Sequence, residues 1–127
     1  MRTDGPPRIL LIDDDERFLD VTSRRLQATG MAVNRARSLR EALPHLGRRP
    51  HAVLLDLRMA VLSGEELCAL LKRDYSPIRV FFYSSEPEST LRELAAEHGA
   101  DGYLSKSADR EELVELLLRH LDPAGPR

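Results

Sequence analysis

The segment HAVLLDLRMAVLSGEEL, residues 51–67, decides the fold of this chain. Four apolar residues, 52–55, run without a break into Asp56. An uninterrupted apolar run of this length is typical of a strand that is covered on both faces, in the middle of a parallel sheet. Asp56 would then lie where the strand leaves the sheet, at the edge where such folds bind ligands. This segment alone is equally compatible with Asp56 simply beginning a turn, so the rest of the chain must decide.

A second continuous apolar run, ILLI at residues 9–12, also ends in acidic residues, Asp13 to Glu16. Three further segments have the β-branched, aromatic or alternating pattern of strands: 31–36, 78–83 and 103–104. Apolar residues at helical spacing follow each strand. Regular alternation of strands and helices predicts a single α/β domain with five parallel strands and helices on both faces of the sheet.

The starts of three helices are predicted from capping boxes, in which a serine is followed three residues later by a glutamate. The pairs are Ser38 with Glu41, Ser63 with Glu66 and Ser85 with Glu88. One charged residue, Arg79, falls within a predicted strand. We expect its side chain to reach solvent at the N-terminal end of that strand.

Composition favours one globular domain without a membrane or nucleic-acid surface. The chain has 127 residues and a net charge of −2, and its basic residues are spread rather than clustered. Its single cysteine, Cys68, excludes an internal disulfide and suits a reducing cytoplasm; we expect it to be buried on the apolar side of a helix. No apolar run could cross a membrane. We therefore predict a cytoplasmic protein with a lead-in at 1–7, a domain at 8–122, and a tail or start of a linker at 123–127.

Carboxylates are predicted to converge at one edge of the sheet. If the strands at 9–12 and 52–55 are neighbours, the side chains of Asp13, Asp14 and Asp56 crowd together. Such charges repel by several kcal/mol unless a cation intervenes or a pKa rises. N-capping of the following helix would explain one acid, Asp15, but not the whole cluster. Oxygen ligands that are open to water suit Mg²⁺, so the sequence predicts a magnesium site.

Two more polar residues are predicted at the same edge. Ser84 ends the fourth strand, and Lys106 follows the fifth. A serine in a loop or a surface lysine is usually only solvated, but here both lie at strand ends beside the acids. A hydroxyl and an ammonium next to a metal-bound carboxylate form a site for a dianionic phosphoryl group.

With these motifs the chain resembles the receiver (CheY-like) domain of bacterial two-component response regulators, from residue 9 to about 121. The matching motifs are ILLIDDD at 9–15, LLDLRM at 54–59 with Gly64, FFYSS at 81–85, and GADGYLSK at 99–106. They occur in the family's order and at suitable spacing. The resemblance implies a flavodoxin-like (βα)5 fold with the strand order 2-1-3-4-5.

The resemblance also implies roles for the acidic residues. Asp56 would be the phosphoacceptor, modified by a sensor histidine kinase or a histidine phosphotransfer protein with Mg²⁺ as cofactor. Asp14 would ligate the metal directly, Asp13 through water, and the backbone carbonyl of Arg58 would be another ligand. Such a domain catalyses its own phosphotransfer and dephosphorylation without being a turnover enzyme.

Further implied roles concern the switch. Ser84 would hold the phosphoryl group in the active state, Lys106 would pair with it, and Tyr103 would change rotamer when the Ser84 loop moves. Arg58 and Glu86 would occupy variable positions that tune the lifetime of the phosphoryl group. The change would pass to a downstream protein or output domain through the surface of the fourth helix, fifth strand and fifth helix.

Three positions depart from the common pattern of the family. Ala60 stands where a proline usually follows Met59, and Ser63 where an aspartate or similar residue often precedes the glycine. Ser107 follows Lys106 where the family usually has a proline in a cis peptide. A cis bond before a residue other than proline costs about 3 kcal/mol, so we expect a trans bond, or strain, at this peptide. The substitution leaves the direction of the Lys106 side chain open, but not its presence at the site.

Two other functions are compatible with the sequence. A binding module could keep the receiver fold while working without phosphorylation. A haloacid-dehalogenase-like phosphatase would also use Asp and Mg²⁺ at strand ends, and residues 13–15 contain its Asp-x-Asp motif. Arg17, however, stands where that motif has Thr or Val, and the chain is short for a cap domain.

Overall fold

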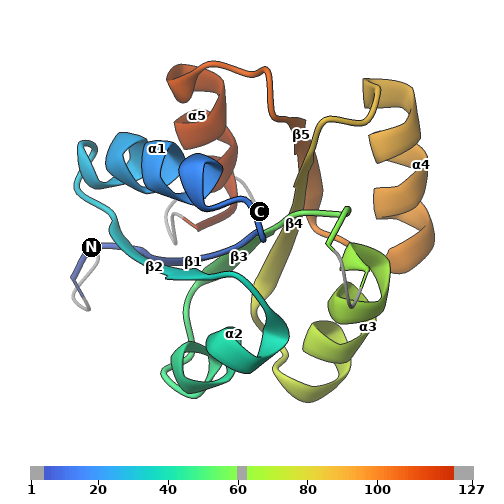
Figure 1. Ribbon diagram of the computed structural model, residues 1–127, viewed down its shortest axis with the longest axis horizontal. Coiled ribbons are helices and arrows are strands. Elements are labelled where there is room, and N and C mark those ends of the chain that lie inside the picture. The colour runs from blue at the N-terminus through green and yellow to red at the C-terminus, as the bar shows by residue number, and fades with distance from the viewer. Residues whose placement is uncertain (1–4, 60–62, 122–127) are drawn as a thin grey trace.

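A parallel five-stranded sheet forms the centre of the computed structural model, which describes residues 5–59 and 63–121 (Figure 1). The strands are β1 (Arg8–Ile12), β2 (Ala32–Ala36), β3 (Ala52–Leu55), β4 (Arg79–Ser84) and β5 (Gly102–Ser105). The helices are α1 (Glu16–Gln27), α2 (Leu39–Leu46), α3 (Gly64–Asp74), α4 (Glu88–His98) and α5 (Arg110–Leu121). The strand order β2-β1-β3-β4-β5 confirms the predicted flavodoxin-like fold.

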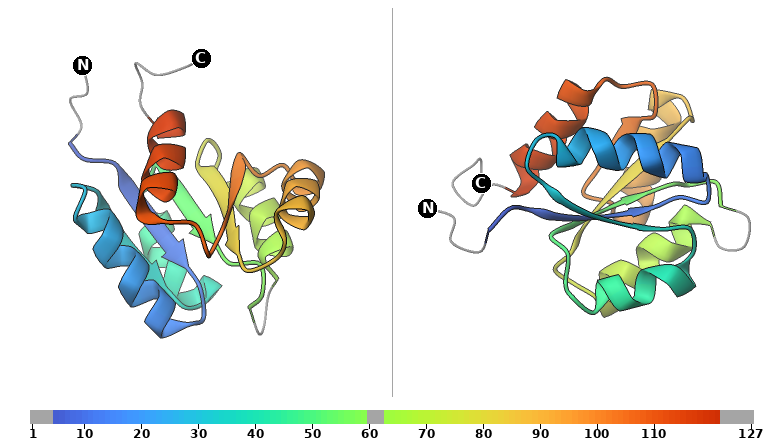
Figure 2. Two further views of the ribbon diagram at one scale, coloured as in Figure 1. Left: turned by 90° about the horizontal axis from the view of Figure 1, so that it is seen from above. Right: turned by 60° about the vertical axis from the view of Figure 1, so that its left-hand side comes forward.

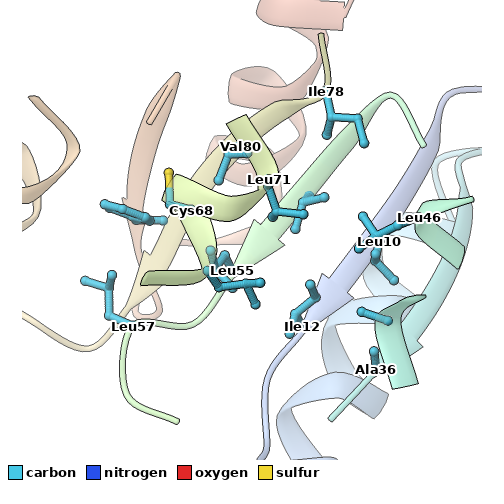
Figure 3. Close-up of a cluster of buried hydrophobic side chains, with 14 of the residues drawn as sticks. Leu10, Ile12, Ala36, Leu46, Leu55, Leu57, Cys68, Leu71, Ile78 and Val80 are labelled. Atoms are coloured by element: carbon cyan, nitrogen blue, oxygen red, sulfur yellow. The ribbon is translucent and has the colours of Figure 1, made fainter. Parts of the chain in front are cut away.

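Each face of the sheet has its own hydrophobic core, as expected when helices cover both sides (Figure 2). Successive residues of a strand point to opposite faces, so Leu10 and Ile12 pack with α2 and α3 residues such as Leu46 and Leu71 (Figure 3). Ile9 and Leu11 pack on the opposite face of the sheet, against α1 and α5. The unbroken apolar runs therefore serve two cores at once.

Strand register brings the polar residues after the strands to the same height. Ile12 of β1 pairs with Leu55 of β3, so the next residues, Asp13 and Asp56, leave the sheet side by side. The backbone N–H of Asp56 donates to the carbonyl of Ile12 at 2.9 Å. Across β4 and β5, the N–H of Lys106 donates to the Ser84 carbonyl at 2.8 Å. The four predicted site residues therefore share the C-terminal edge of the sheet.

The helix starts follow the predictions in part. Ser63 and Glu66 form a complete capping box at α3. Ser38 caps α2 by accepting from the N–H of Glu41, but the Glu41 carboxylate accepts from the N–H of Arg37, so only half of that box forms.

The third predicted box, Ser85 with Glu88, is wrong. The helix begins at Glu88 itself after Pro87, with no side-chain hydrogen bond to its first turn. Proline at this position fixes φ and leaves Ser85 too far upstream to reach the free N–H groups.

Several smaller predictions are confirmed. Arg79 is exposed at the start of β4, and Cys68 is fully buried, where burial raises the pKa of its thiol to about 11. A thiol with so high a pKa is an inert core side chain. Among the helices of the described residues, none has the length and apolar character that a membrane crossing requires. Ala60 lies outside the described residues.

Candidate functional site

Three carboxylates meet at the C-terminal edge of the sheet, as predicted. Asp13, Asp14 and Asp56 each offer one oxygen, and these oxygens lie within 4.8 Å of one another. Asp13 and Asp56 are buried, while Asp14 is exposed. Asp15 does not join the cluster but caps α1, as expected, by accepting from the backbone N–H of Arg17.

Lys106 is the cation inside this acidic pocket. Its Nζ lies 2.7 Å from Oδ2 of Asp13 and 3.4 Å from Oδ1 of Asp56, and its side chain is 16% exposed. Burial by itself would lower the pKa of Lys106, but the hydrogen bond and charge of Asp13, together with the charge of Asp56, raise it above its ordinary value. A single, largely buried lysine side chain therefore contacts two buried carboxylates.

The surroundings of Asp56 change the pKa of its carboxyl group. Burial, and then the charge of Asp13, raise the pKa of Asp56 from 3.8 to about 6, against the opposing effect of Lys106. A carboxyl group whose pKa is raised in this way is typical of functional sites, where an ionised group is retained for chemistry at a cost to stability.

The donor set fits a magnesium ion. Three carboxylate groups supply oxygen ligands only, one of them open to solvent, which is the environment that Mg²⁺ prefers. A divalent cation would also relieve the repulsion that raises the pKa of Asp56. Nothing in the geometry tests the backbone carbonyl of Arg58 as a further ligand, which stays a prediction.

Close backbone approach explains the glycine that opens α3. A Cβ atom on Gly64 would lie 2.6 Å from the carbonyl oxygen of Asp56 and 2.7 Å from Cα of Leu57. Real Cβ atoms do not approach backbone so closely, so a side chain here would displace the residue that carries the central carboxylate. Gly64 therefore holds the start of α3 against the segment of Asp56.

Ser84 and Tyr103 lie on the neighbouring strands. Ser84 is buried at the end of β4, where its Oγ accepts weakly from the N–H of Glu86 at 3.4 Å. Tyr103 is half-buried on β5, packs against the core that includes α4 residues, and accepts a hydrogen bond from Nε of Arg92 at 3.2 Å. Ser84 thus ends the strand next to that of Asp56, and Tyr103 ties β5 to α4.

Arg58 and Glu86 form an ion pair that the sequence did not predict. Arg58 follows Asp56 by two residues in the loop after β3, and Glu86 follows Ser84 by two residues after β4. Their side chains are hydrogen-bonded, which links the two loops beside the pocket. The sequence identified both positions separately, but their pairing depends on how far apart the loops lie.

The loop after β5 reaches the pocket with a trans peptide at Lys106–Ser107. Among the described residues the one cis peptide bond precedes Pro77. The N–H of Ser107 donates to Oγ of Ser105 at 3.1 Å, and the N–H of Ala108 donates to the Ser105 carbonyl at 3.0 Å. This turn directs Lys106 into the pocket although Ser107 stands where the related domains described above usually have a proline.

Two residues near the site were missed by the sequence analysis, Phe18 and Ser105. The ring of Phe18 lies beneath the Lys106 ammonium, and Ser105 anchors the turn that carries it. Phe18 is one of the apolar residues at helical spacing that follow the strand at 9–12, and no role in the site was predicted for it. Its closeness in sequence to the acidic cluster was the one signal that could have pointed to it.

The sequence of residues 9–118 matches the response regulator receiver domain family, and the chain belongs to that family. It is 34% identical over 122 residues to the response regulator MprA of Mycolicibacterium vanbaalenii, covering 93% of this chain and 53% of that protein. Identity is 35% over 109 residues with the transcriptional regulatory protein PrrA of Mycobacterium leprae, covering 85% and 47%. The chain thus spans about half the length of these curated relatives.

Solved structures agree with this assignment. The chemotaxis protein CheY4 of Vibrio cholerae superposes with a TM-score of 0.83 at 26% identity, covering 92% of this chain and all of that one. A response regulator from Burkholderia pseudomallei, solved with a phosphorylated aspartic acid, a calcium ion and citrate, gives a TM-score of 0.75 at 30% identity, covering 92% and 67%. Members of this family are signalling modules, so the alternative that the chain is a haloacid-dehalogenase-like phosphatase is not supported.

Proposed function

We propose that the chain accepts a phosphoryl group on Asp56 from a phosphohistidine of a sensor histidine kinase or a histidine phosphotransfer protein. The change would then pass to a downstream protein or output domain. One observation carries the proposal: the buried carboxylate of Asp56 shares Lys106 with Asp13 inside a group of three acids. Membership of the receiver family supports the same chemistry.

In the proposed reaction an Oδ atom of Asp56 attacks the phosphorus of the donor. A phosphorus–oxygen bond forms, the phosphorus–nitrogen bond breaks, and the electron pair stays with the departing imidazole. Lys106 offsets the charge of the incoming phosphoryl oxygens, and Asp13 holds the ammonium in place at 2.7 Å. Bound Mg²⁺, held by Asp13, Asp14 and Asp56 with the carbonyl of Arg58, would supply further neutralisation of charge.

Ser84 and Tyr103 are proposed as the switch. The new acyl phosphate adds negative charge and acceptor oxygens next to Ser84, whose hydroxyl accepts from the N–H of Glu86 at the long distance of 3.4 Å. Movement of Ser84 toward the phosphoryl group would leave room for the side chain of Tyr103. Tyr103 would then lose its hydrogen bond with Arg92 and rotate inward. The surface of α4, β5 and α5 would then change its shape for a partner.

The Arg58–Glu86 pair is proposed to set the lifetime of the phosphoryl group. The pair bridges the two loops beside Asp56, and its side chains are 68% and 20% exposed. It would limit the access of water to the acyl phosphate. Opening of the pair by substitution of Glu86 should shorten that lifetime.

The remaining assignments are also proposals. We propose that the receiver domain comprises residues 8–122, and that the segment 123–127 is a tail or the start of a linker. We further propose a cytoplasmic location, where a reduced, buried Cys68 and a kinase partner would be expected.

Incubation with acetyl phosphate and Mg²⁺ tests the proposal. The protein should gain the mass of one phosphoryl group, located on Asp56 by peptide mapping after borohydride reduction. Asp56→Asn should gain none. If no phosphoryl group is gained, while a partner binds equally to the wild type and to Asp56→Ala, the chain is a phosphorylation-independent binding module instead.

A further inference from the structure

The Lys106 ammonium has a third neighbour besides its two carboxylates, and that neighbour is an aromatic ring. Nζ of Lys106 lies 4.2 Å from the ring centroid of Phe18. The same Nζ contacts Asp13 and Asp56 at 2.7 and 3.4 Å. The ammonium therefore has acids on one side and the face of a ring on another.

The ring is fixed from two directions. The backbone N–H of Phe18 donates to the capping carboxylate of Asp15 at 3.3 Å, which anchors the residue in the first turn of α1. The ring packs against Tyr83 of β4, with centroids 5.1 Å apart and an interplanar angle of 57°. Tyr83 is itself buried, so α1 and β4 together hold the ring beneath the lysine.

The pocket also makes this contact stronger than one on the surface. Phe18 and Tyr83 line a small cavity that Asp13 and Asp56 of the acidic cluster also line. The ring face carries partial negative charge and attracts a cation, and the attraction grows when water is excluded. At 16% exposure the Lys106 side chain has lost most of its water.

We infer that Phe18 is a positioning residue that holds Lys106 in the pocket, pointed at Asp13 and Asp56, before a phosphoryl group arrives. A lysine side chain confined to one geometry loses considerable rotamer freedom. The ring offsets that loss by favouring the inward position over solvent. The inference depends on the proposed function only for its consequence, which is faster and tighter engagement of the phosphoryl group.

The competing explanation is that Phe18 only fills space. Substitutions that change the charge of the ring face but not its shape separate the two. Phenylalanine with three ring fluorines at position 18 keeps the volume and removes most of the negative charge of the ring face. Phe18→Leu removes the ring, and Phe18→Tyr keeps it.

The first measurement uses the resting protein and needs no phosphoryl chemistry. The ε-methylene protons of Lys106 should show an upfield ring-current shift, and the NMR order parameter of this methylene group should be high. The order parameter should fall in the trifluoro-phenylalanine variant and in Phe18→Leu, and stay high in Phe18→Tyr. Lys72, which pairs with Asp101 elsewhere in the protein, is the internal control and should not change.

The second measurement is the concentration of beryllofluoride, with excess Mg²⁺, that half-saturates the protein. Loss of the contact should raise it roughly threefold to tenfold in Phe18→Leu and in the trifluoro variant. Phe18→Tyr should stay within about twofold of the wild type. In a Lys106→Ala background the same substitutions at position 18 should have no effect, because there is no ammonium to hold.

The results separate the two claims. A Lys106 order parameter that does not respond to fluorination, or an effect of fluorination that persists in Lys106→Ala, would overturn the positioning role. If the wild type binds no beryllofluoride, the phosphoacceptor proposal fails, while the NMR measurement still decides the role of Phe18. The trifluoro variant keeps the shape of the side chain, so the test does not depend on whether Phe18→Leu folds.

Discussion

Two lysine–aspartate pairs of nearly equal length lie at opposite ends of the same sheet, and they have different surroundings. Nζ of Lys72 lies 2.8 Å from Oδ2 of Asp101, and Nζ of Lys106 lies 2.7 Å from Oδ2 of Asp13. Both pairs join a side chain from outside the sheet to a residue beside a strand. Distance alone would therefore give them the same role.

The Lys72–Asp101 pair, at the N-terminal end of β4, is balanced. Asp101 also accepts from the backbone N–H of Val80 at 2.7 Å, and the guanidinium of Arg79 lies 3.7 Å away. Lys72 additionally donates to the carbonyl of Ile78 at 3.4 Å. One carboxylate with these donors around it is a structural connection between α3 and the starts of β4 and β5.

The Lys106–Asp13 pair is not balanced. Lys106 is shared with Asp56, and Asp14 completes a group of three acids. Burial, and then the negative charge of Asp13, raise the pKa of Asp56 to about 6 although Lys106 lies close by. The comparison shows that an ion pair indicates function when its surroundings leave charge uncompensated, rather than when its distance is short.

Removal of Lys106 should affect the rate of phosphorylation, whereas removal of Lys72 should affect stability. The loss of rate is the largest effect that we predict. Lys106→Met should lower the rate of Asp56 phosphorylation by acetyl phosphate roughly a hundredfold, because a preorganised cation at the reacting group is lost. Lys72→Met should leave this rate within about twofold and lower the free energy of unfolding by about 1 kcal/mol. Rates from mass spectrometry and urea unfolding curves measure both; equal loss of rate in the two variants would contradict the comparison.

Stability should depend on pH through Asp56. Its pKa rises on folding from 3.8 to about 6, so the folded protein binds more protons between these values. The contribution of Asp56 to stability is therefore highest below pH 4 and falls as the pH rises through 6. Above that pH the ionised group costs about 2–3 kcal/mol.

Asp56→Asn isolates this effect. The free energy of unfolding of the wild type, relative to Asp56→Asn, should fall between pH 4 and pH 7.5 in the absence of Mg²⁺. Saturating Mg²⁺ should flatten the dependence, since the metal favours the ionised carboxylate. A difference that stays constant across this pH range, measured by urea unfolding, would show that Asp56 is not under the predicted electrostatic stress.

The smallest predicted effect concerns the turn after β5. The Oγ of Ser105 accepts from the backbone N–H of Ser107 and is also hydrogen-bonded to the Ser107 hydroxyl at 2.8 Å. Ser105→Ala removes both bonds and should slow phosphorylation about twofold to fivefold. Ser107→Ala, the matched control, loses only the bond between the two hydroxyls and keeps the backbone N–H that holds the turn, so it should react nearly like the wild type. Ser105→Thr, which restores the hydroxyl, should recover the rate; no recovery would assign the effect to packing instead of the hydrogen bond.

The fold and the acidic group could be predicted from the sequence because both follow from simple geometry. Apolar runs such as 9–12 and 52–55 indicate buried parallel strands, and the carboxyl ends of such strands share an edge. Asp13 and Asp56 follow these runs directly. Their convergence therefore needed only the assumption that the two strands are neighbours.

Other features depend on side-chain geometry that a sequence pattern does not contain. The motif placed Lys106 near the phosphoacceptor, yet its closer contact is Asp13, and the ring of Phe18 beneath it follows from the packing of α1 on the sheet. The wrong capping box at Ser85 has a similar cause. Proline starts that helix later than the serine pattern suggests.

The central claim is that the three acids at the C-terminal edge, Asp13, Asp14 and Asp56, form a divalent-metal site, and a magnesium titration of stability tests it most directly. At pH 7.5 the free energy of unfolding of the wild type should rise with Mg²⁺, by about 2.7 kcal/mol at a hundred times the dissociation constant. Asp14→Asn should lose most of this rise, whereas Asp101→Asn, at the balanced pair, should keep it. A wild type that gains no stability from Mg²⁺, or an Asp14→Asn variant that gains as much, would contradict the account.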